Sequence, residues 1–155
     1  MKPQSTAQAE LSPEWRSLLD AALDARRRAY APYSEFAVGA AVRAASGAVY
    51  TGCNIENASS GLTVCAERVA IWKAVEAGET SIQALAVVSV GGATPCGACR
   101  QVMVEFAVNL PVLVADVEGH AWLTDLQTLL PDAFPRHLYG DDHEWRADSR
   151  SRSMP

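Results

Sequence analysis

The sequence predicts one α/β domain in which a mixed sheet has helices on both faces. The length of 155 residues is typical of a single domain, and 49% hydrophobic with 20% charged residues is a globular composition. The apolar positions switch repeatedly between helical and strand spacing, in the order α-ββ-α-β-α-β(β)-α. We expect a flexible N-terminus over residues 1–10, a folded domain over residues 11–140 and a disordered tail over residues 141–155.

A helix and a hairpin are expected first. Ser12-Pro13 is typical of a helix start, with Ser as N-cap and Pro at the first helical position, and apolar spacing continues to Arg28. Small and β-branched residues over 36–44 and 49–55 are separated by a Ser-Gly turn. These two runs predict an antiparallel hairpin.

Helices and strands then alternate. Helical character over residues 65–77 ends at Gly78, which suits a C-terminal cap. The apolar run over residues 84–90 is typical of a strand buried on both faces. Apolar residues at i, i+3, i+4 and i+7 from Cys99 predict the next helix.

The last elements are a second hairpin and a short helix. Residues 112–115 and 120–123 flank a polar turn and predict the hairpin. Thr124 and Gln127 have the spacing of a capping box, which predicts a short helix that ends before Pro131.

Charge and composition exclude several classes of function. Thirteen basic and eighteen acidic residues give a net charge of −5, which argues against a nucleic-acid partner. No apolar run approaches the ~20 residues of a membrane span, and the polar start has no signal core. We therefore expect a cytoplasmic protein that binds neither nucleic acid nor membrane. Four cysteines in such a chain indicate reduced thiols for metal or redox chemistry.

The segment Cys96-Gly97-Ala98-Cys99 lies between a predicted strand and a predicted helix. Its two thiols could ligate a metal, form a redox dithiol or simply begin the helix. The motif alone does not distinguish these alternatives.

Cys65-Ala66-Glu67 also lies where a loop becomes a helix. Two helix starts can direct three sulfurs at one point, and each helix dipole favours thiolate over thiol. Zinc accepts such ligands, and a catalytic zinc keeps its fourth position for water. Glu67 projects to a different side from Cys65, so it suits a general acid/base rather than a ligand. The alternative for Glu67 is an exposed carboxylate at a helix start.

Together the two motifs match the zinc deaminase signature of a ligand-x-Glu followed by Pro-Cys-x-x-Cys. From about Tyr30 to Leu138 the chain resembles the small cytidine deaminases. The segments that carry the resemblance are 31–40, 52–58, 65–71, 95–102 and 129–134.

The resemblance implies a three-layer α-β-α cytidine deaminase-like fold with a mixed five-stranded sheet. It implies a zinc-dependent deaminase domain over residues 11–140 and a homotetramer with shared active sites. The implied reaction converts cytidine or deoxycytidine to uridine or deoxyuridine plus ammonia, as in pyrimidine salvage. A zinc-activated hydroxide would attack C4 of the base.

The resemblance also assigns roles within the zinc site. One zinc per chain would be held by Cys65, Cys96 and Cys99. Glu67 would move the proton to N3 and then to the departing amine. Arg68 would donate to the sulfurs, and its charge would offset the net −1 of three thiolates around Zn²⁺.

The substrate contacts are implied in the same way. The residues assigned to them are Phe36 against the base, Asn54 and Glu56 on the ribose hydroxyls, Ala66, and Phe134 reaching a neighbouring subunit's pocket. Asn54 and Glu56 are two apart at a strand end, so their side chains face the same way. Without the motif, Asn54 and Glu56 could equally be polar residues at a strand end, and Phe36 would be a core residue.

Alternatives to this function remain open. Ser60 stands where the family usually has an aromatic residue at the sugar end, so the substrate could be a modified cytosine nucleoside or an aminopyrimidine antibiotic such as blasticidin S. A thiol–disulfide oxidoreductase would use only Cys96 and Cys99. A structural zinc site would need Cys53 as a fourth ligand, although we expect Cys53 to be a buried structural thiol.

Overall fold

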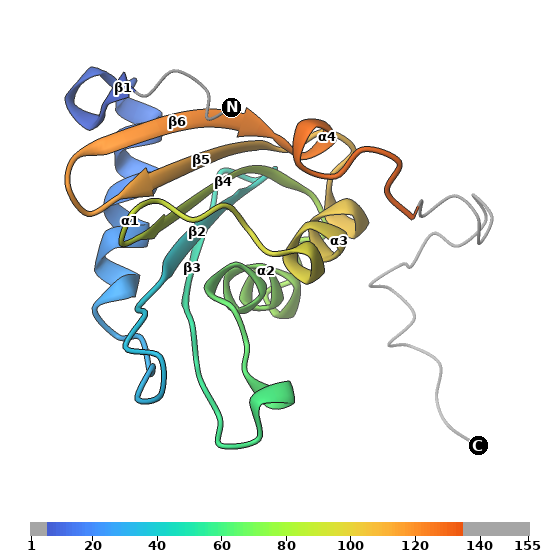
Figure 1. Ribbon diagram of the computed structural model, residues 1–155. Helices are drawn as coiled ribbons and strands as arrows, with labels where there is room; N and C mark the ends of the chain where they lie inside the picture. The colour runs from blue at the N-terminus through green and yellow to red at the C-terminus, as the bar shows by residue number, and fades with distance from the viewer. Residues whose placement is uncertain (1–5, 135–155) are drawn as a thin grey trace, which may run out of the picture.

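The computed structural model describes residues 6–134, which form a sheet between two layers of helices (Figure 1). The strands are β1 (Thr6–Ala7), β2 (Gly39–Ala44), β3 (Val49–Cys53), β4 (Ile82–Ser89), β5 (Pro111–Asp116) and β6 (His120–Asp125). The helices are α1 (Pro13–Arg26), α2 (Ala66–Glu76), α3 (Gly97–Phe106) and α4 (Leu126–Leu129), with 3-10 turns at Gln8–Glu10 and Ser60–Leu62.

The strand order is β1-β6-β5-β4-β2-β3. Only β4 and β5 pair in parallel, so the sheet is mixed. The five predicted strands are β2 to β6, and the predicted α/β class is confirmed. The expected tail over residues 141–155 lies outside the described residues.

β1 is an addition to the expected sheet. Thr6 and Ala7 pair with Ala121 and His120 at the open edge of β6, and the Gln8 N–H donates to Gly119 O at 2.9 Å. Residues 6–10 therefore have regular structure, although they fall in the segment that we expect to be flexible. The edge strand β6 offers unpaired backbone groups, and these pair with residues 6 and 7. The polar character of the N-terminal segment does not reveal this pairing.

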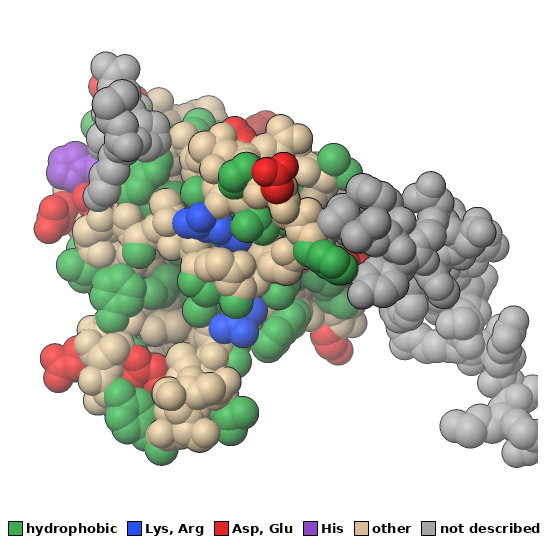
Figure 2. Space-filling model, turned by 45° about the vertical axis from the view of Figure 1, so that its right-hand side comes forward, with side chains coloured by type: hydrophobic (Ala, Val, Ile, Leu, Met, Phe, Trp, Pro, Cys, Tyr) green, Lys and Arg blue, Asp and Glu red, His purple; other side chains and the backbone are tan. Residues whose placement is uncertain are grey.

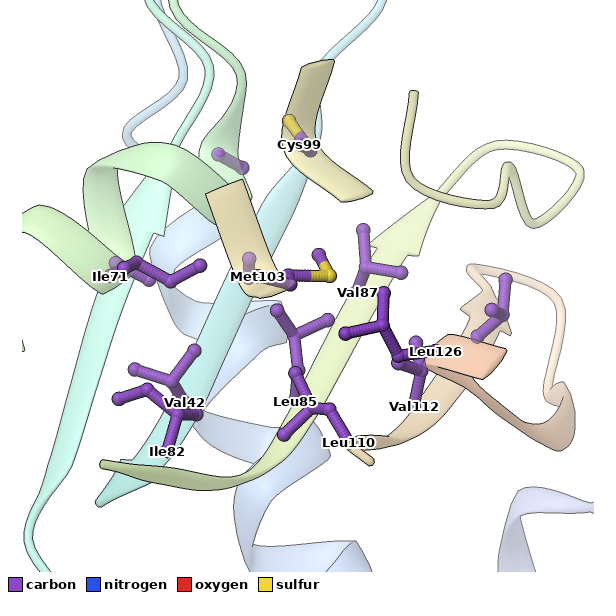
Figure 3. Close-up of a cluster of buried hydrophobic side chains, with 14 of the residues drawn as sticks. Val42, Ile71, Ile82, Leu85, Val87, Cys99, Met103, Leu110, Val112 and Leu126 are labelled. Carbon is purple, nitrogen blue, oxygen red and sulfur yellow. The ribbon is translucent and has the colours of Figure 1, made fainter. Parts of the chain in front are cut away.

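Two hydrophobic cores lie on opposite faces of the sheet. On one face α1 packs Leu18, Leu19 and Ala22 against the sheet, which contributes Ala41, Ala86 and Leu113. On the other face α2 and α3 pack Ile71, Cys99 and Met103 against Val42, Leu85, Val87 and Val112 (Figure 3). Successive residues of β2, β4 and β5 alternate between these cores, as the period of two in a strand requires. The apolar run of β4 is therefore buried on both sides, as predicted.

Two glycines let the flanking helices lie directly on the sheet. A Cβ on Gly39 would stand 2.1 Å from the carbonyl oxygen of Ala22 in α1. A Cβ on Gly52 would stand 2.3 Å from the carbonyl oxygen of Ala66 and 2.5 Å from the nitrogen of Ala70 in α2. The missing side chain at Gly52 thus sets how closely the first turn of α2 approaches β3.

The predicted capping box at the last helix is wrong. Asp125 caps α4, because its Oδ1 accepts from the Thr128 N–H at 2.8 Å. Thr124 is still part of β6 and pairs with Val112, so the helix begins after the predicted position. Within residues 6–134, no helix combines the length and the apolar character needed to cross a membrane.

We expect Gly52→Ala to lower the free energy of unfolding, because the added methyl group meets helix backbone that cannot rotate away. Overpacking of this kind costs about 1–3 kcal/mol, which for a chain of this size lowers Tm by roughly 2–12 °C. Thermal denaturation of the two proteins measures the difference. Gly61→Ala is the control, since a Cβ there meets nothing within 4 Å. Equal Tm values for both variants would contradict the close approach of α2 and β3.

Candidate active site

The candidate site forms at one end of the sheet, where three strand ends meet. Gly39 at the start of β2 pairs with Cys53 at the end of β3 and with Val88 near the end of β4. The segment before β2, the segment after β3 and the loop after β4 therefore converge. Helices α2 and α3 both begin beside this edge (Figure 1).

Three thiols meet at the two helix starts. Cys65 and Cys96 occupy the N-cap positions of α2 and α3, and Cys99 lies in the first turn of α3. The Sγ atoms of Cys65 and Cys96 are 3.8 Å apart, those of Cys96 and Cys99 are 3.5 Å apart, and all three lie within 4.8 Å of one another. Tetrahedral zinc with Zn–S bonds of about 2.3 Å needs sulfurs about 3.8 Å apart. The donor set therefore fits zinc with a fourth position left open.

The surroundings affect the charge of Cys65 and Cys99 in opposite directions. The pKa of Cys65 is lowered to about 5, first by a hydrogen bond from the Cys99 thiol and then by the Arg68 guanidinium and Cys96. The pKa of Cys99 is raised because its thiol donates to Cys65 and is buried. A metal bound to these sulfurs would displace their thiol protons, because it ligates the thiolate form.

Arg68 lies behind the cluster, on the first turn of α2. Its Nη2 is 3.6 Å from the Sγ of Cys65 and 3.5 Å from the carbonyl oxygen of Thr63. The guanidinium also stands over the ring of Trp72, 5.9 Å from the centroid. The residue is therefore held where its charge faces the sulfurs.

Glu67 is buried beside the cluster, with 4% of its surface exposed. Burial raises its pKa to about 7, since a desolvated carboxylate is disfavoured. The group of potential metal ligands contains the three sulfurs and not this carboxylate. The alternative of an exposed helix-start carboxylate is therefore wrong, and the side chain can exchange a proton near neutral pH.

A cavity of about 480 Å³ opens onto Glu67, Cys65 and Cys96. Of the residues assigned to the substrate by resemblance, those that line it are Phe36, Asn54, Glu56 and Ala66. A volume between 300 and 1,000 Å³ is usual for small-molecule sites, so about one nucleoside fits.

Other lining residues were not assigned from the sequence. They are Ser34, Val38, Thr63, Val87, Ala93 and Thr94. Their place in the sequence could have identified some of them, because Thr63 shortly precedes Cys65 and Ala93-Thr94 directly precedes Pro95-Cys96. Ser34 lies within residues 31–40, a segment that carries the resemblance, but the resemblance assigns a role there only to Phe36.

The polar residues after β3 are engaged by the chain itself. Asn54 Oδ1 accepts from the Val38 N–H, and its Nδ2 donates to the Phe36 carbonyl, both at 2.8 Å. Ile55 forms isolated bridges to Tyr30 and Val64 on either side. The backbone thus stays extended past Cys53, the last residue of β3, and side chains two positions apart point the same way, as we expect. Asn54 and Glu56 therefore line the same cavity.

Phe134 and Cys53 do not reach the site of their own chain. Phe134 is not among the described residues that line the cavity, and 57% of its surface is exposed, while its carbonyl accepts from Gln101 Nε2 at 3.0 Å. Cys53 is half-buried rather than buried, and its thiol donates to the Arg28 carbonyl at 3.3 Å. Because Cys53 lies outside the sulfur cluster, the described residues do not form a four-cysteine site.

A second group of potential ligands lies at the β5–β6 turn, in Asp116, Glu118 and His120. Asp116 Oδ1 accepts from the N–H groups of Glu118 and His120, and its Oδ2 pairs with His120 Nδ1, all at 2.9 Å. These contacts stabilise the turn between β5 and β6.

Comparison with known proteins agrees with this geometry. Residues 13–115 match the family model for the cytidine and deoxycytidylate deaminase zinc-binding region. The cytidine deaminase of Sporosarcina psychrophila is 50% identical over 115 residues, which cover 72% of this chain and 85% of that protein. That of Halalkalibacterium halodurans is 46% identical, over 76% of this chain and 91% of that protein.

Solved structures are similar as well. The crystal structure of cytidine deaminase from Burkholderia pseudomallei matches with a TM-score of 0.75 and 46% identity, over 80% of this chain and all of that one. The enzyme from Mycobacterium tuberculosis matches with a TM-score of 0.70 and 40% identity, over 79% of this chain and 98% of that one. The predicted family and cofactor are confirmed: the chain belongs to the zinc-binding cytidine and deoxycytidylate deaminase family.

Proposed function

We propose that this protein hydrolyses the 4-amino group of cytidine and deoxycytidine and releases ammonia and the corresponding uridine. The observation that carries the proposal is a buried carboxylate, Glu67, which shares a nucleoside-sized cavity with the sulfur cluster. Two relatives named cytidine deaminases, 50% and 46% identical, support the same substrate class. A thiol–disulfide oxidoreductase would leave both the cavity and Glu67 without a role.

We assign one zinc per chain to Cys65, Cys96 and Cys99. When bound, zinc supplies a Lewis acid that lowers the pKa of water and makes a nucleophile available near neutral pH. Arg68 offsets part of the negative charge of the thiolates through its approach to Cys65.

Glu67 is the proposed proton carrier. It accepts a proton from the attacking water and delivers it to N3 of the base. It then takes the proton of the new C4 hydroxyl group and delivers it to the departing amine, while the C4 carbonyl forms and ammonia leaves. Burial supports this role, because it holds the carboxylate near the point where both protonation states are populated at neutral pH.

The remaining cavity residues bind and orient the nucleoside. Phe36 packs against the base, Ala66 contacts the ring edge, and Asn54 and Glu56 hydrogen-bond the ribose hydroxyls. Their position along one cavity supports these assignments, since the base must point to Glu67 while the sugar points away. Val38 and Val87 give the cavity an apolar lining that suits a nucleobase.

We further propose a homotetramer in which Phe134 completes the pocket of a neighbouring subunit. The exposed ring of Phe134, outside its own cavity, supports a role toward another chain. Most soluble oligomers are symmetric, and a closed tetramer repeats the same contact at every site.

The proposed setting is the cytoplasm, in the salvage of free pyrimidine nucleosides by a domain over residues 11–140. Reduced thiols at Cys65, Cys96 and Cys99 support a reducing compartment. The net charge of −5 supports a small-molecule substrate rather than a nucleic-acid or membrane partner.

We expect elemental analysis of the purified protein to find about one zinc per chain, and Cys96→Ser to lose most of it, because two thiolates hold zinc far less tightly than three. Cys53→Ser is the matched control and should retain the metal, since Cys53 lies outside the sulfur cluster. Full zinc content in Cys96→Ser would remove this ligand assignment.

We expect Glu67→Gln to retain zinc and fold while its turnover of cytidine falls at least 10²–10⁴-fold, roughly the contribution of a general acid/base. Ammonia release measures turnover across cytidine, deoxycytidine, modified cytosine nucleosides and aminopyrimidine antibiotics. Glu76→Gln is the control, because Glu76 is an exposed glutamate at the far end of the same helix.

Activity of Glu67→Gln within about tenfold of the wild type would mean that another residue carries the proton. Release of ammonia by the wild type only from the antibiotics or modified nucleosides would replace the proposed substrate. No release from any of these compounds, with dithiol-dependent reduction of a disulfide instead, would favour the oxidoreductase.

We expect Phe134→Ala to weaken cytidine binding without loss of zinc. Co-expression of Phe134→Ala with Glu67→Gln should restore part of the activity, because some shared sites then receive both wild-type groups. Each variant expressed alone is the control. A monomer in light scattering that has full activity would end the shared-site proposal.

A further inference from the structure

The chain just before β2 forms a bent segment that carries Phe36 to the cavity. Together with the segment after β3 it projects beyond the sheet (Figure 1), as a lobe of mixed acidic and hydrophobic surface (Figure 2). Glu35 within it has φ 57, in the left-handed region that side chains other than glycine seldom adopt. Such a turn persists only where contacts around it hold it in place.

The hydroxyl of Ser34 makes two of these contacts. It donates to Oε1 of Glu56, and it accepts from the Phe36 N–H at 3.1 Å. One oxygen atom thereby joins the residue proposed for the sugar to the residue proposed for the base. Ser34 itself also lines the cavity.

The other contacts leave Glu56 little freedom. Its Oε2 accepts from the N–H groups of Tyr33 at 2.8 Å and Ser34 at 3.3 Å. A carboxylate has about four lone-pair positions, so these two bonds and the Ser34 hydroxyl leave about one. The remaining position is on Oε1, the oxygen that the Ser34 hydroxyl orients. A substrate hydroxyl that binds Glu56 must use it.

We propose that Ser34 is a positioning residue, which sets Glu56 and Phe36 in the arrangement that receives the nucleoside. The proposal rests on the proposed function. Without the hydroxyl, Glu56 and the Phe36 backbone must be ordered when the substrate binds, and this cost is the same in the ground state and in the transition state. A change of that kind raises KM and leaves kcat unaltered. The hydrogen bond from Ser34 is also the main reason that the pKa of Glu56 is lowered.

The test compares Ser34→Ala with the wild type in steady-state deamination of cytidine. Loss of a hydrogen bond to a charged group predicts a KM roughly tenfold higher, with kcat within about twofold. Calorimetry with uridine, the product, should show a Kd higher by a similar factor. Ser34→Thr keeps the hydroxyl at an exposed position and should restore KM to within about twofold.

The β2–β3 turn offers a matched control. The hydroxyl of Ser46 donates to Oε1 of Glu79 and accepts from the Ala48 N–H at 3.2 Å, the same pattern as at Ser34. This turn lies at the other end of β2 from the cavity. Ser46→Ala therefore removes the same bonds, and we expect KM and kcat to stay unchanged.

The proposal is overturned if Ser34→Ala has a KM within twofold of the wild type, if kcat falls instead of KM rising, or if Ser46→Ala raises KM equally. Failure of Ser34→Thr to restore KM would also overturn it. Failure of the proposed function is a separate result, because the wild type would then not deaminate cytidine at all.

Discussion

The site depends on the close approach of α2 to β3, which the absence of a side chain at Gly52 permits. With the backbone of Ala66 within 2.3 Å of where a Cβ would stand, the first turn of α2 lies directly on the end of the sheet. Cys65 and Glu67 are the neighbours of Ala66 in the chain, so this contact fixes where they lie. Cys99 joins them from α3 as part of the hydrophobic core (Figure 3), so the sulfur cluster is anchored by packing before any metal binds.

The same arrangement shifts the pKa values of Cys65 and Glu67 in opposite directions. Two helix N-termini and Arg68 favour negative charge on sulfur, while burial disfavours it on Glu67. The Cys65 side chain thus favours the thiolate form that a metal binds, and the adjacent Glu67 carboxylate keeps access to both of its protonation states. In the proposed mechanism, metal ligation and proton transfer thus fall to different residues at the start of α2, Cys65 and Glu67, two positions apart.

The sequence predicted those parts of the molecule that have a local or periodic signal. The apolar run of β4 and the thiols at two helix starts are of this kind. Contacts between distant segments left no such signal: β1 joins an edge formed by residues 120–121, and Asn54 bonds to backbone 16 and 18 residues away. The cap of α4 was misplaced for a related reason, because pairing with β5 keeps Thr124 in a strand. Phe134 could be assigned only by resemblance, and its own chain does not place it in the cavity.

These long-range contacts limit the polar groups that Asn54 and Glu56 can offer to a substrate. Asn54 has about one N–H and one lone pair left after it holds the segment before β2, and Glu56 has about one lone pair left. Ser60, at the position that departs from the family pattern, is exposed in a 3-10 turn and is not among the described residues that line the cavity. In the proposed assignment, where Asn54 and Glu56 bind the sugar, a substrate that fails to pair one of these remaining positions loses a large share of their recognition. Under the proposed assignment, the orientation of Asn54 and Glu56, rather than the number of polar groups, determines which nucleosides this cavity accepts.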